Sequence, residues 1–473
     1  MTSLKSDLPE ARGLSLLAVD SEIMKEAVET YLANPVFQAA RYEELVLDDN
    51  PYRRPVRPDD IGLVDFGTPL RREDFAQLSG LMGHRMLLNI HDTGRLLLPS
   101  LPTDQKWHDY QRFYNPESRF LGSLIRPYLE AHLFGFVQRE AAGRGPRTTA
   151  GLGEQAPAAA ADRRHRAAEL ADVVAAARPQ DRDPMIDMLA IQSDAASLNA
   201  GTRPATALSN VAGSASLPGV HSGQIGGDLM RRVADSAGIK YEPHSYIQYY
   251  LPSTLALMNY VNAAALDPGR VFALAGALMA HALETRELEG AVEPLLAERL
   301  QEPGTVGALE RVADPAGYAD RALGAALAVV ERAGGEFAVA EFGRGLQEYT
   351  VLLEIHHEDR MTQFRWINDM PAYAEKARRL QNAITGHGID VDLDTFVESW
   401  EECSTTHVHD QDRLLVIESG QMEFWNCFGR RHEFRPGDMT FIPKHRLHGS
   451  VVLSGECVYH QPVITAELDR QFG

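Results

Sequence analysis

The sequence predicts a multidomain α + β protein, in which two helical modules precede a C-terminal antiparallel jelly-roll barrel. Apolar residues recur at three- and four-residue intervals through two long stretches, as on the buried faces of amphipathic helices. After Gly388 the pattern changes to short β-type runs separated by turn residues. The length of 473 residues accommodates about three domains of the usual size.

The first predicted module spans residues 1–140. Its helical periodicity is clearest in EIMKEAVETYLANPVFQAARYEELV and in LGSLIRPYLEAHLFGFVQRE. Residues 141–165 follow, with the sequence AAGRGPRTTAGLGEQAPAAAADRRH, which is rich in Gly, Ala and Pro and nearly devoid of large apolar side chains. Such a composition buries too little apolar surface to offset the entropy of ordering, so we expect a flexible linker.

The second helical module is expected over residues 166–387, and the barrel over residues 388–473. Helical segments of the module include SYIQYYLPSTLALMNYVNAAAL and GRGLQEYTVLLEI. Six β-type runs follow in the barrel region: VESWEEC, RLLVIE, SGQMEFW, DMTFIP, GSVVLS and ECVYHQPV. Short strands in this number and spacing are what an antiparallel jelly roll needs.

Charge and composition exclude several classes of partner. The formal net charge of −20 disfavours nucleic acid and anionic membranes, so we expect a small-molecule substrate. No run of about 18 uncharged apolar residues and no secretory signal is present, which predicts a cytoplasmic protein. Cys403, Cys427 and Cys457 form no CxxC pair, and we expect packed thiols.

Three histidines in the barrel region form a candidate metal site. His407 and His409 are two residues apart, so that on one strand both imidazoles point to the same face. His448 follows a turn and a strand, and can return to the same cavity, whereas His445 falls one position out of step and is expected at the surface or behind the ligands. Three neutral imidazoles leave coordination positions open, as catalytic metal sites require.

These residues resemble the two sequence signatures of the cupin superfamily, HxH and then PGD-x4-P-x4-H. Arg413 stands where the common cupin glutamate ligand would be, and arginine does not ligate a metal at neutral pH. The resemblance therefore implies a three-histidine site holding one Fe(II), with zinc as an alternative that residue types do not exclude. Arg413 either binds an anionic group of the substrate or turns outward, and Tyr459 either donates a hydrogen bond into the cavity or packs in the core. A decayed barrel that keeps its histidines for packing is the structural alternative.

Several longer stretches carry a more particular likeness. NPYRRPVRP, FYNPESRFLGSLIRPYLEAHLFGF, RGLQEYTVLLEI, THVHDQDRLLVIESGQMEF and RLHGSVVLSGECVY are similar, in the same order, to the N-nitrosourea-forming metalloenzymes of streptozotocin biosynthesis. The resemblance implies an N-terminal helical dimerisation domain, which would make the protein a homodimer. It also implies a central haem-oxygenase-like diiron domain that hydroxylates guanidine nitrogens, and a mononuclear iron cupin that rearranges the product. Arg53, Arg54, Arg57, Tyr114 and Arg126 are shared with this family, and we expect salt bridges across a helical interface.

The ligands of a diiron centre are missing from the central module. Two ferrous ions in a bundle need about six or seven inward carboxylates and imidazoles, but residues 166–350 contain three histidines only, His221, His244 and His281. Asp194 is the one plausible carboxylate at a ligand position of the family. The other ligand positions fall on residues that do not bind metals, namely Ala215, Ile225, Ala282, Arg311, Pro315 and Tyr318. We therefore expect no diiron centre. A relocated metal site formed from His281, Glu284 and Glu287, with Glu310 and Asp314, is the alternative.

The sequence thus predicts a cupin enzyme that has lost its companion site. The leading hypothesis is an iron- and dioxygen-dependent enzyme that forms or rearranges an N–N bond on an N-oxygenated guanidine or amino acid supplied by another enzyme, with Arg413 holding a carboxylate. A second is a zinc or iron cupin of other chemistry, namely N–N coupling or an ordinary dioxygenase reaction. A third is a non-catalytic partner of an active diiron homologue.

Overall fold

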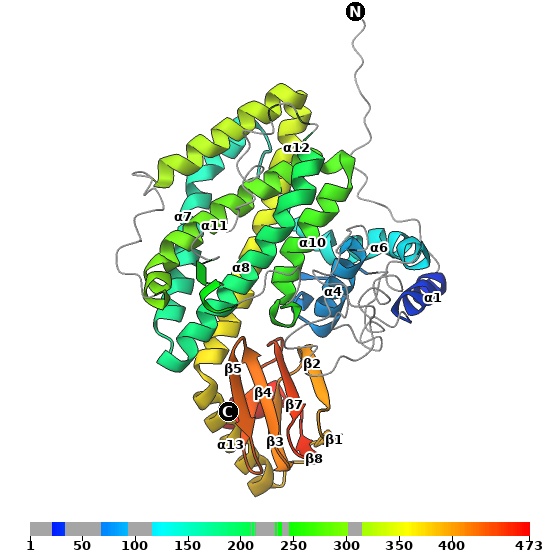
Figure 1. The fold of residues 1–473 in the computed structure, drawn as a ribbon, viewed down its shortest axis with the longest axis vertical. Helices are drawn as coiled ribbons and strands as arrows, with labels where there is room; N and C mark the ends of the chain where they lie inside the picture. Colours follow the sequence, from blue (N-terminus) through cyan, green and yellow to red (C-terminus); the bar gives the residue numbers. More distant parts are fainter. Residues whose placement is uncertain are drawn as a thin grey trace, which may run out of the picture.

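The computed structural model describes residues 21–33, 68–92, 116–209, 211, 213, 232–233, 235–238, 246–300 and 315–473. A body of helices occupies most of the molecule, and the β-strands of the C-terminal region lie together at one end of it (Figure 1). This arrangement confirms the predicted fold class of helical modules followed by a cupin-like antiparallel β domain.

The described N-terminal helices are α1 (Ser21–Leu32), the short η2 (Arg72–Asp74), α4 (Leu78–Asp92) and α6 (Pro116–Ala142). Both α1 and α4 pack against α6. The contact is close because α6 carries Gly122, where an added Cβ would lie within 3.7 Å of the Ile90 and Tyr31 side chains.

The prediction of a flexible linker over residues 141–165 is wrong. Helix α7 (Thr149–Ala175) occupies most of it, and begins at Thr148, whose hydroxyl accepts a hydrogen bond from the Gly151 N–H at 3.1 Å. Alanine has the highest helix propensity, and its small side chain lets two helices approach closely. Helix α7 buries Ala156 and Ala160 and packs against α11 and α12, so tertiary contact replaces the missing large side chains.

The central bundle combines α7 with α8 (Pro179–Leu208), α10 (Pro252–Leu266), α11 (Val271–Arg299) and α12 (Pro315–Asn368); the 3₁₀ turns η4 (Ile247–Tyr249) and η5 (Pro268–Arg270) flank α10. Residues 252–264 of α10 are all buried, as expected for a helix that is apolar on every side. Helices α11 and α12 touch at Gly276 and Gly345, where an added Cβ would lie 2.0 and 1.8 Å from carbonyl oxygens of the other helix. Helix α12 is kinked at Gly335, which has φ 62.

No single helix in the described ranges is both long enough and apolar enough to cross a membrane, and α10 with α11 reaches that composition only as a pair bent by 108°.

The C-terminal domain consists of two four-stranded antiparallel sheets, with strand orders β1-β8-β3-β6 and β2-β7-β4-β5. The strands are β1 (Thr395–Ser399), β2 (Cys403–His407), β3 (Arg413–Ser419), β4 (Met422–Cys427), β5 (Arg430–Phe434), β6 (Met439–Ile442), β7 (His448–Val452) and β8 (Glu456–His460). Helix α13 (Met370–His387) packs on β6 and on the terminal helix α14 (Ala466–Phe472). The end of α12 enters the core between the sheets, where Trp366 packs with Phe424.

Candidate metal centre

The three predicted histidines lie together at one end of the β domain. Strands β2 and β7 are antiparallel neighbours, and His407 is the direct cross-strand partner of His448; His409 follows two residues after β2 ends. The ring centroids are 4.5 Å apart for His407 and His448, 4.8 Å for His407 and His409, and 4.9 Å for His409 and His448. Across the described part of the chain, this is the one group of three or more potential ligands at metal-site spacing.

A β-bulge in β2 helps to aim these side chains. Ser404 pairs with Ser450 and His407 pairs with His448, so β2 has one residue more than β7 between the two pairs. A bulge of this kind re-aims side chains at the rim of a β structure. Because of it, Ser404 and His407 both face the cavity although their odd spacing would place them on opposite faces of a regular strand.

His448 is held in the form that binds a metal. Its Nδ1 donates a hydrogen bond to the Arg446 carbonyl at 2.8 Å, so that Nε2 carries the lone pair. Nε2 is buried and has no hydrogen-bond partner among the described residues. Burial lowers the pKa of His448 to about 4, which keeps the imidazole neutral at physiological pH. The donor set therefore fits a metal ion that prefers nitrogen ligands.

The histidines open into a cavity of about 230 Å³ that contains both other predicted site residues, Arg413 and Tyr459. The placement of Arg413 removes the alternative in which it turns outward. The sequence left open whether Tyr459 reaches the cavity or packs in the core, and the structure combines the two. Tyr459 lines the cavity, and its ring stacks on that of Phe396 with centroids 5.1 Å apart. Two carboxylates, Asp394 and Glu398, also line this cavity.

The guanidinium of Arg413 is already engaged by protein groups. Its Nη1 donates to the Asp394 carboxylate and, at 3.1 Å, to the Gln461 carbonyl. The ion pair with Asp394 neutralises this side of the cavity. A substrate carboxylate bound by Arg413 would have to share the guanidinium with Asp394.

Glu398 is a cavity residue that the sequence reasoning missed. Its Oε1 accepts a hydrogen bond from the Tyr459 hydroxyl at 2.8 Å, whereas Oε2 is buried and has no partner in the described chain. Burial raises the pKa of this carboxyl group. Strand alternation could have indicated that Glu398 faces the cavity, because Phe396 and Glu398 are two residues apart in β1 and both are less exposed than their neighbours.

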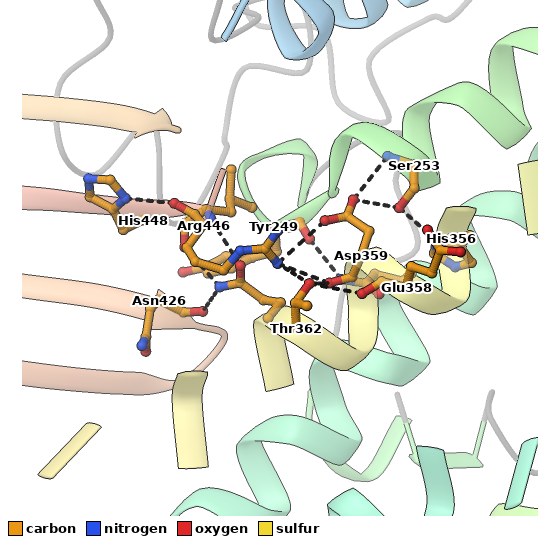
Figure 2. Close-up of polar contacts among 12 residues, drawn as sticks. Tyr249, Ser253, His356, Glu358, Asp359, Thr362, Asn426, Arg446 and His448 are labelled. Atoms are coloured by element: carbon orange, nitrogen blue, oxygen red, sulfur yellow. Dashed lines mark hydrogen bonds and ion pairs between the residues drawn. The ribbon is translucent and has the colours of Figure 1, made fainter. Parts of the chain in front are cut away.

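Helix α12 fixes the backbone that precedes His448 (Figure 2). Arg446 is buried; its Nη1 donates to Thr362 Oγ1 at 2.6 Å and to the Asp359 carbonyl at 3.1 Å, and lies 3.5 Å from the Asp359 carboxylate. The Gln363 amide accepts from the Leu447 N–H and donates to the Leu447 carbonyl, both at 2.9 Å. The ligand His448 is therefore positioned by the helical bundle as well as by its own strand.

The other two ligand segments also contact helices. On α4, the fully buried Arg85 donates to the Thr406 carbonyl at 2.6 Å, and Gln248 accepts from the Thr406 N–H at 3.0 Å. The Leu78 N–H donates to the Asp410 carboxylate at 2.8 Å, and Leu78 itself forms part of the cavity wall. Residues next to each of the three histidines are thus tied to the helical modules.

The remaining predicted residues have mixed outcomes. His445 is half-buried, and its N–H donates to the His409 carbonyl at 2.8 Å, so it supports a ligand segment from behind. Arg126 lies 3.7 Å from Glu130 on its own helix, a pair within α6 instead of across an interface. Cys403, Cys427 and Cys457 are free thiols, as predicted. Other predicted positions lie outside the described residues; these are Arg53, Arg54, Arg57, Tyr114, Ala215, His221, Ile225, His244, Glu310, Arg311 and Asp314.

The residues proposed for a relocated metal site in the bundle have other partners. Glu284 forms an ion pair with Arg166 at 2.8 Å, and His281 contacts the Tyr349 hydroxyl at 3.2 Å. In the described residues these side chains do not group at metal-site spacing. Two further buried histidines, His356 and His357, lie on α12 beyond residue 350 and were not predicted from the sequence.

No known protein family profile matches the chain. The chain is similar to a curated protein, the nitrosourea synthase of Streptomyces achromogenes subsp. streptozoticus, with 28% identity over 460 residues, 92% of this chain and 94% of the relative. This comparison confirms the resemblance inferred from the sequence motifs.

Proposed function

We propose that this protein is a metal-dependent oxidoreductase of natural-product biosynthesis that forms or rearranges an N–N bond on an N-oxygenated guanidine or amino acid. The proposal is supported by one observation above all. A three-histidine cluster, in which His448 is buried and His409 is half-buried, shares a cavity with a carboxylate that lacks a cationic partner in the described chain. The full-length likeness to a nitrosourea synthase supports the same reaction class.

The side chains of the cavity divide into two groups with distinct tasks. Glu398 would accept hydrogen bonds from a guanidinium or ammonium group of the substrate, because its Oε2 is buried and unsatisfied. Tyr459 holds that carboxylate in place, and the Arg413–Asp394 pair forms a neutral polar wall. The cavity therefore favours a cationic substrate head, and the walls around it limit access of water to N-oxygenated groups.

His407, His409 and His448 would hold one Fe(II) ion, which supplies the reaction with dioxygen when bound. Zinc binds the same donor set, and metal analysis of anaerobically purified protein separates the two.

The central bundle would serve as a scaffold without a diiron centre. Support comes from charge: Arg163, Arg166 and Arg360 all lie close enough to Glu284 to interact with it electrostatically. The buried guanidinium groups around Glu284 repel a metal cation and so disfavour metal binding at that carboxylate. We expect about one metal ion per chain. A count of about three would instead indicate a diiron centre in the bundle, and with it both the hydroxylation and the rearrangement that the resemblance implies.

The direct test is turnover of a synthetic N-hydroxylated guanidino amino acid by the iron-loaded full-length protein, with the Streptomyces relative as positive control. Formation of an N-nitroso product is expected. Absence of product beside an active relative would contradict the proposal.

Replacing Glu398 with glutamine is expected to raise KM for the cationic substrate about ten- to hundredfold while changing kcat much less. A hydrogen bond between charged groups contributes roughly 1.5–3 kcal/mol, and glutamine keeps the size of the side chain but removes the charge. Steady-state kinetics of Glu398→Gln provide the measurement. Glu456→Gln, at an exposed position of neighbouring β8, is the matched control, and an equal effect in both variants would contradict a binding role for Glu398.

The N-terminal module would form a homodimer through an apolar surface on α6. Phe120 is 69% exposed and Leu124 is 38% exposed, and they lie four residues apart, on one face of the helix. Exposed large apolar side chains at helical spacing are typical of association surfaces.

The double substitution Phe120→Glu and Leu124→Glu is therefore expected to convert the dimer to a monomer, because charges would be desolvated in the interface. Sedimentation velocity gives the oligomeric state. Phe337→Glu is the control for a charge placed on an exposed aromatic residue of another helix, since Phe337 is 63% exposed on α12. A wild-type monomer, or a double variant that stays dimeric, would rule out this surface.

A further inference from the structure

A second cavity lies within the helical bundle, separate from the histidine site. It measures about 230 Å³ and is bounded by α7, α11, α12 and the segment joining α6 to α7. Leu152, Leu283 and Leu323 supply apolar walls, and Arg144 and Arg163 supply two guanidinium groups. The volume is smaller than the roughly 300–1,000 Å³ of pockets for drug-sized ligands, so a small molecule would fill it.

The two arginines of this cavity differ in their partners. Arg144 forms a paired contact with the Glu354 carboxylate, with distances of 2.7 and 2.5 Å. Arg163 is only 7% exposed, and its buried Nε has no hydrogen-bond partner. In the described part of the chain Glu284 and Glu287 interact with it electrostatically, but neither forms a hydrogen bond or an ion pair with it. Desolvating a charge without a partner costs several kcal/mol. A buried arginine of this kind is explained when a ligand supplies the missing anion.

Among the described residues, the carboxylates near Arg163 do not form an ion pair with it. Glu284 is engaged by Arg166, with Arg166 Nη2 2.8 Å from Glu284 Oε2. Glu287 interacts with Arg163 only at longer range, without an ion pair in the described residues. Arg360 adds a further buried guanidinium beside Glu284. Among these guanidinium groups, Arg163 is the one that lines the cavity without a carboxylate in hydrogen-bond contact in the described residues.

We propose that this bundle cavity binds a small molecule with one carboxylate group and an apolar body, and that Arg163 is the counter-charge for that carboxylate. The planar guanidinium matches a carboxylate in geometry. One cation balances a monoanion, whereas a dianion such as phosphate would leave a negative charge uncompensated in an apolar site. The leucine and alanine walls would contact the rest of the ligand.

Calorimetric titration of the full-length protein with hexanoate and with hexanamide, its uncharged counterpart, tests the proposal. Hexanoate is expected to bind at least about tenfold more tightly than hexanamide, because a charge-assisted contact contributes about 1.5–3 kcal/mol. Arg163→Met should remove that preference. Arg164→Met, at the adjacent exposed position, should retain it.

A carboxylate could also bind at the histidine site, so the titration is repeated in His407→Ala, where hexanoate binding is expected to persist. Equal affinity for the acid and the amide, no saturable binding below about 10 mM, or unchanged hexanoate binding in Arg163→Met would overturn the proposal. Thermal unfolding without ligand gives a second criterion. Arg163→Met should be at least as stable as the wild type, because an unpaired buried charge has been removed, and marked destabilisation would identify Arg163 as structural.

Discussion

His407→Ala is expected to reduce bound metal from about one ion per chain to nearly none, and to abolish formation of the N–N bonded product. His407 faces His448 directly across the β2–β7 pair, so its loss leaves two imidazoles, too few to hold an ion against exchange with water. Inductively coupled plasma analysis and product detection on the same preparation measure both effects.

His445→Ala is the matched control, because His445 is close in sequence and partly buried, and its hydrogen bond to the His409 carbonyl comes from the backbone N–H, which alanine retains. It should retain the metal and most of the activity. Loss of product in His407→Ala supports an enzyme. If His407→Ala lost its metal yet left the activity of a partner diiron enzyme unchanged, and the wild type made no product, the hypothesis of a non-catalytic partner would replace the present one.

The sequence predicted those parts of the site that depend on local pattern. His407 and His409 are two residues apart, and the turn at Pro436-Gly437-Asp438 with the strand after it can return His448 to the same place. The resemblance to the cupin signatures supported this grouping, although β2 ends at His407 and His409 lies just beyond the strand. Tyr459 and Arg413 were also predicted as site residues, and both line the cavity. The partners of Arg413 did not follow from pattern, because Asp394 lies just before β1 and Gln461 just after β8, segments far apart in the chain.

The alanine-rich segment shows the opposite limit. Composition predicted disorder over residues 141–165, but helix α7 forms there because α11 and α12 cover its small side chains. Such stabilisation is a property of the partner helices and has no local signal. Local sequence pattern likewise does not predict the contact of Arg85 with Thr406, since 321 positions separate the two residues.

Asp359→Ala is expected to destabilise the protein by about 3–5 kcal/mol and to weaken metal binding at the histidine site. Asp359 lies on α12 between Ser253, whose hydroxyl donates to it at 2.7 Å, and Arg446 (Figure 2). Removing the carboxylate leaves the buried Arg446 without its counter-charge, and the loss of one member of a buried ion pair typically has that magnitude. Chemical denaturation of the metal-free protein measures the stability change.

The effect on the metal follows from connectivity. The Arg446 carbonyl accepts a hydrogen bond from the His448 Nδ1–H, so displacement of Arg446 would misalign that imidazole. Loss of a group that orients a ligand typically lowers metal affinity about 10- to 100-fold. Glu358→Ala is the control at the adjacent, exposed position; it removes the same charge and one surface ion pair with Arg72, and should change stability by less than about 1 kcal/mol. If Asp359→Ala lost stability but bound metal with wild-type affinity, α12 would anchor the barrel without positioning its ligand. A parallel loss of both would make the helical bundle part of the metal site, a role for the bundle that does not require a diiron centre.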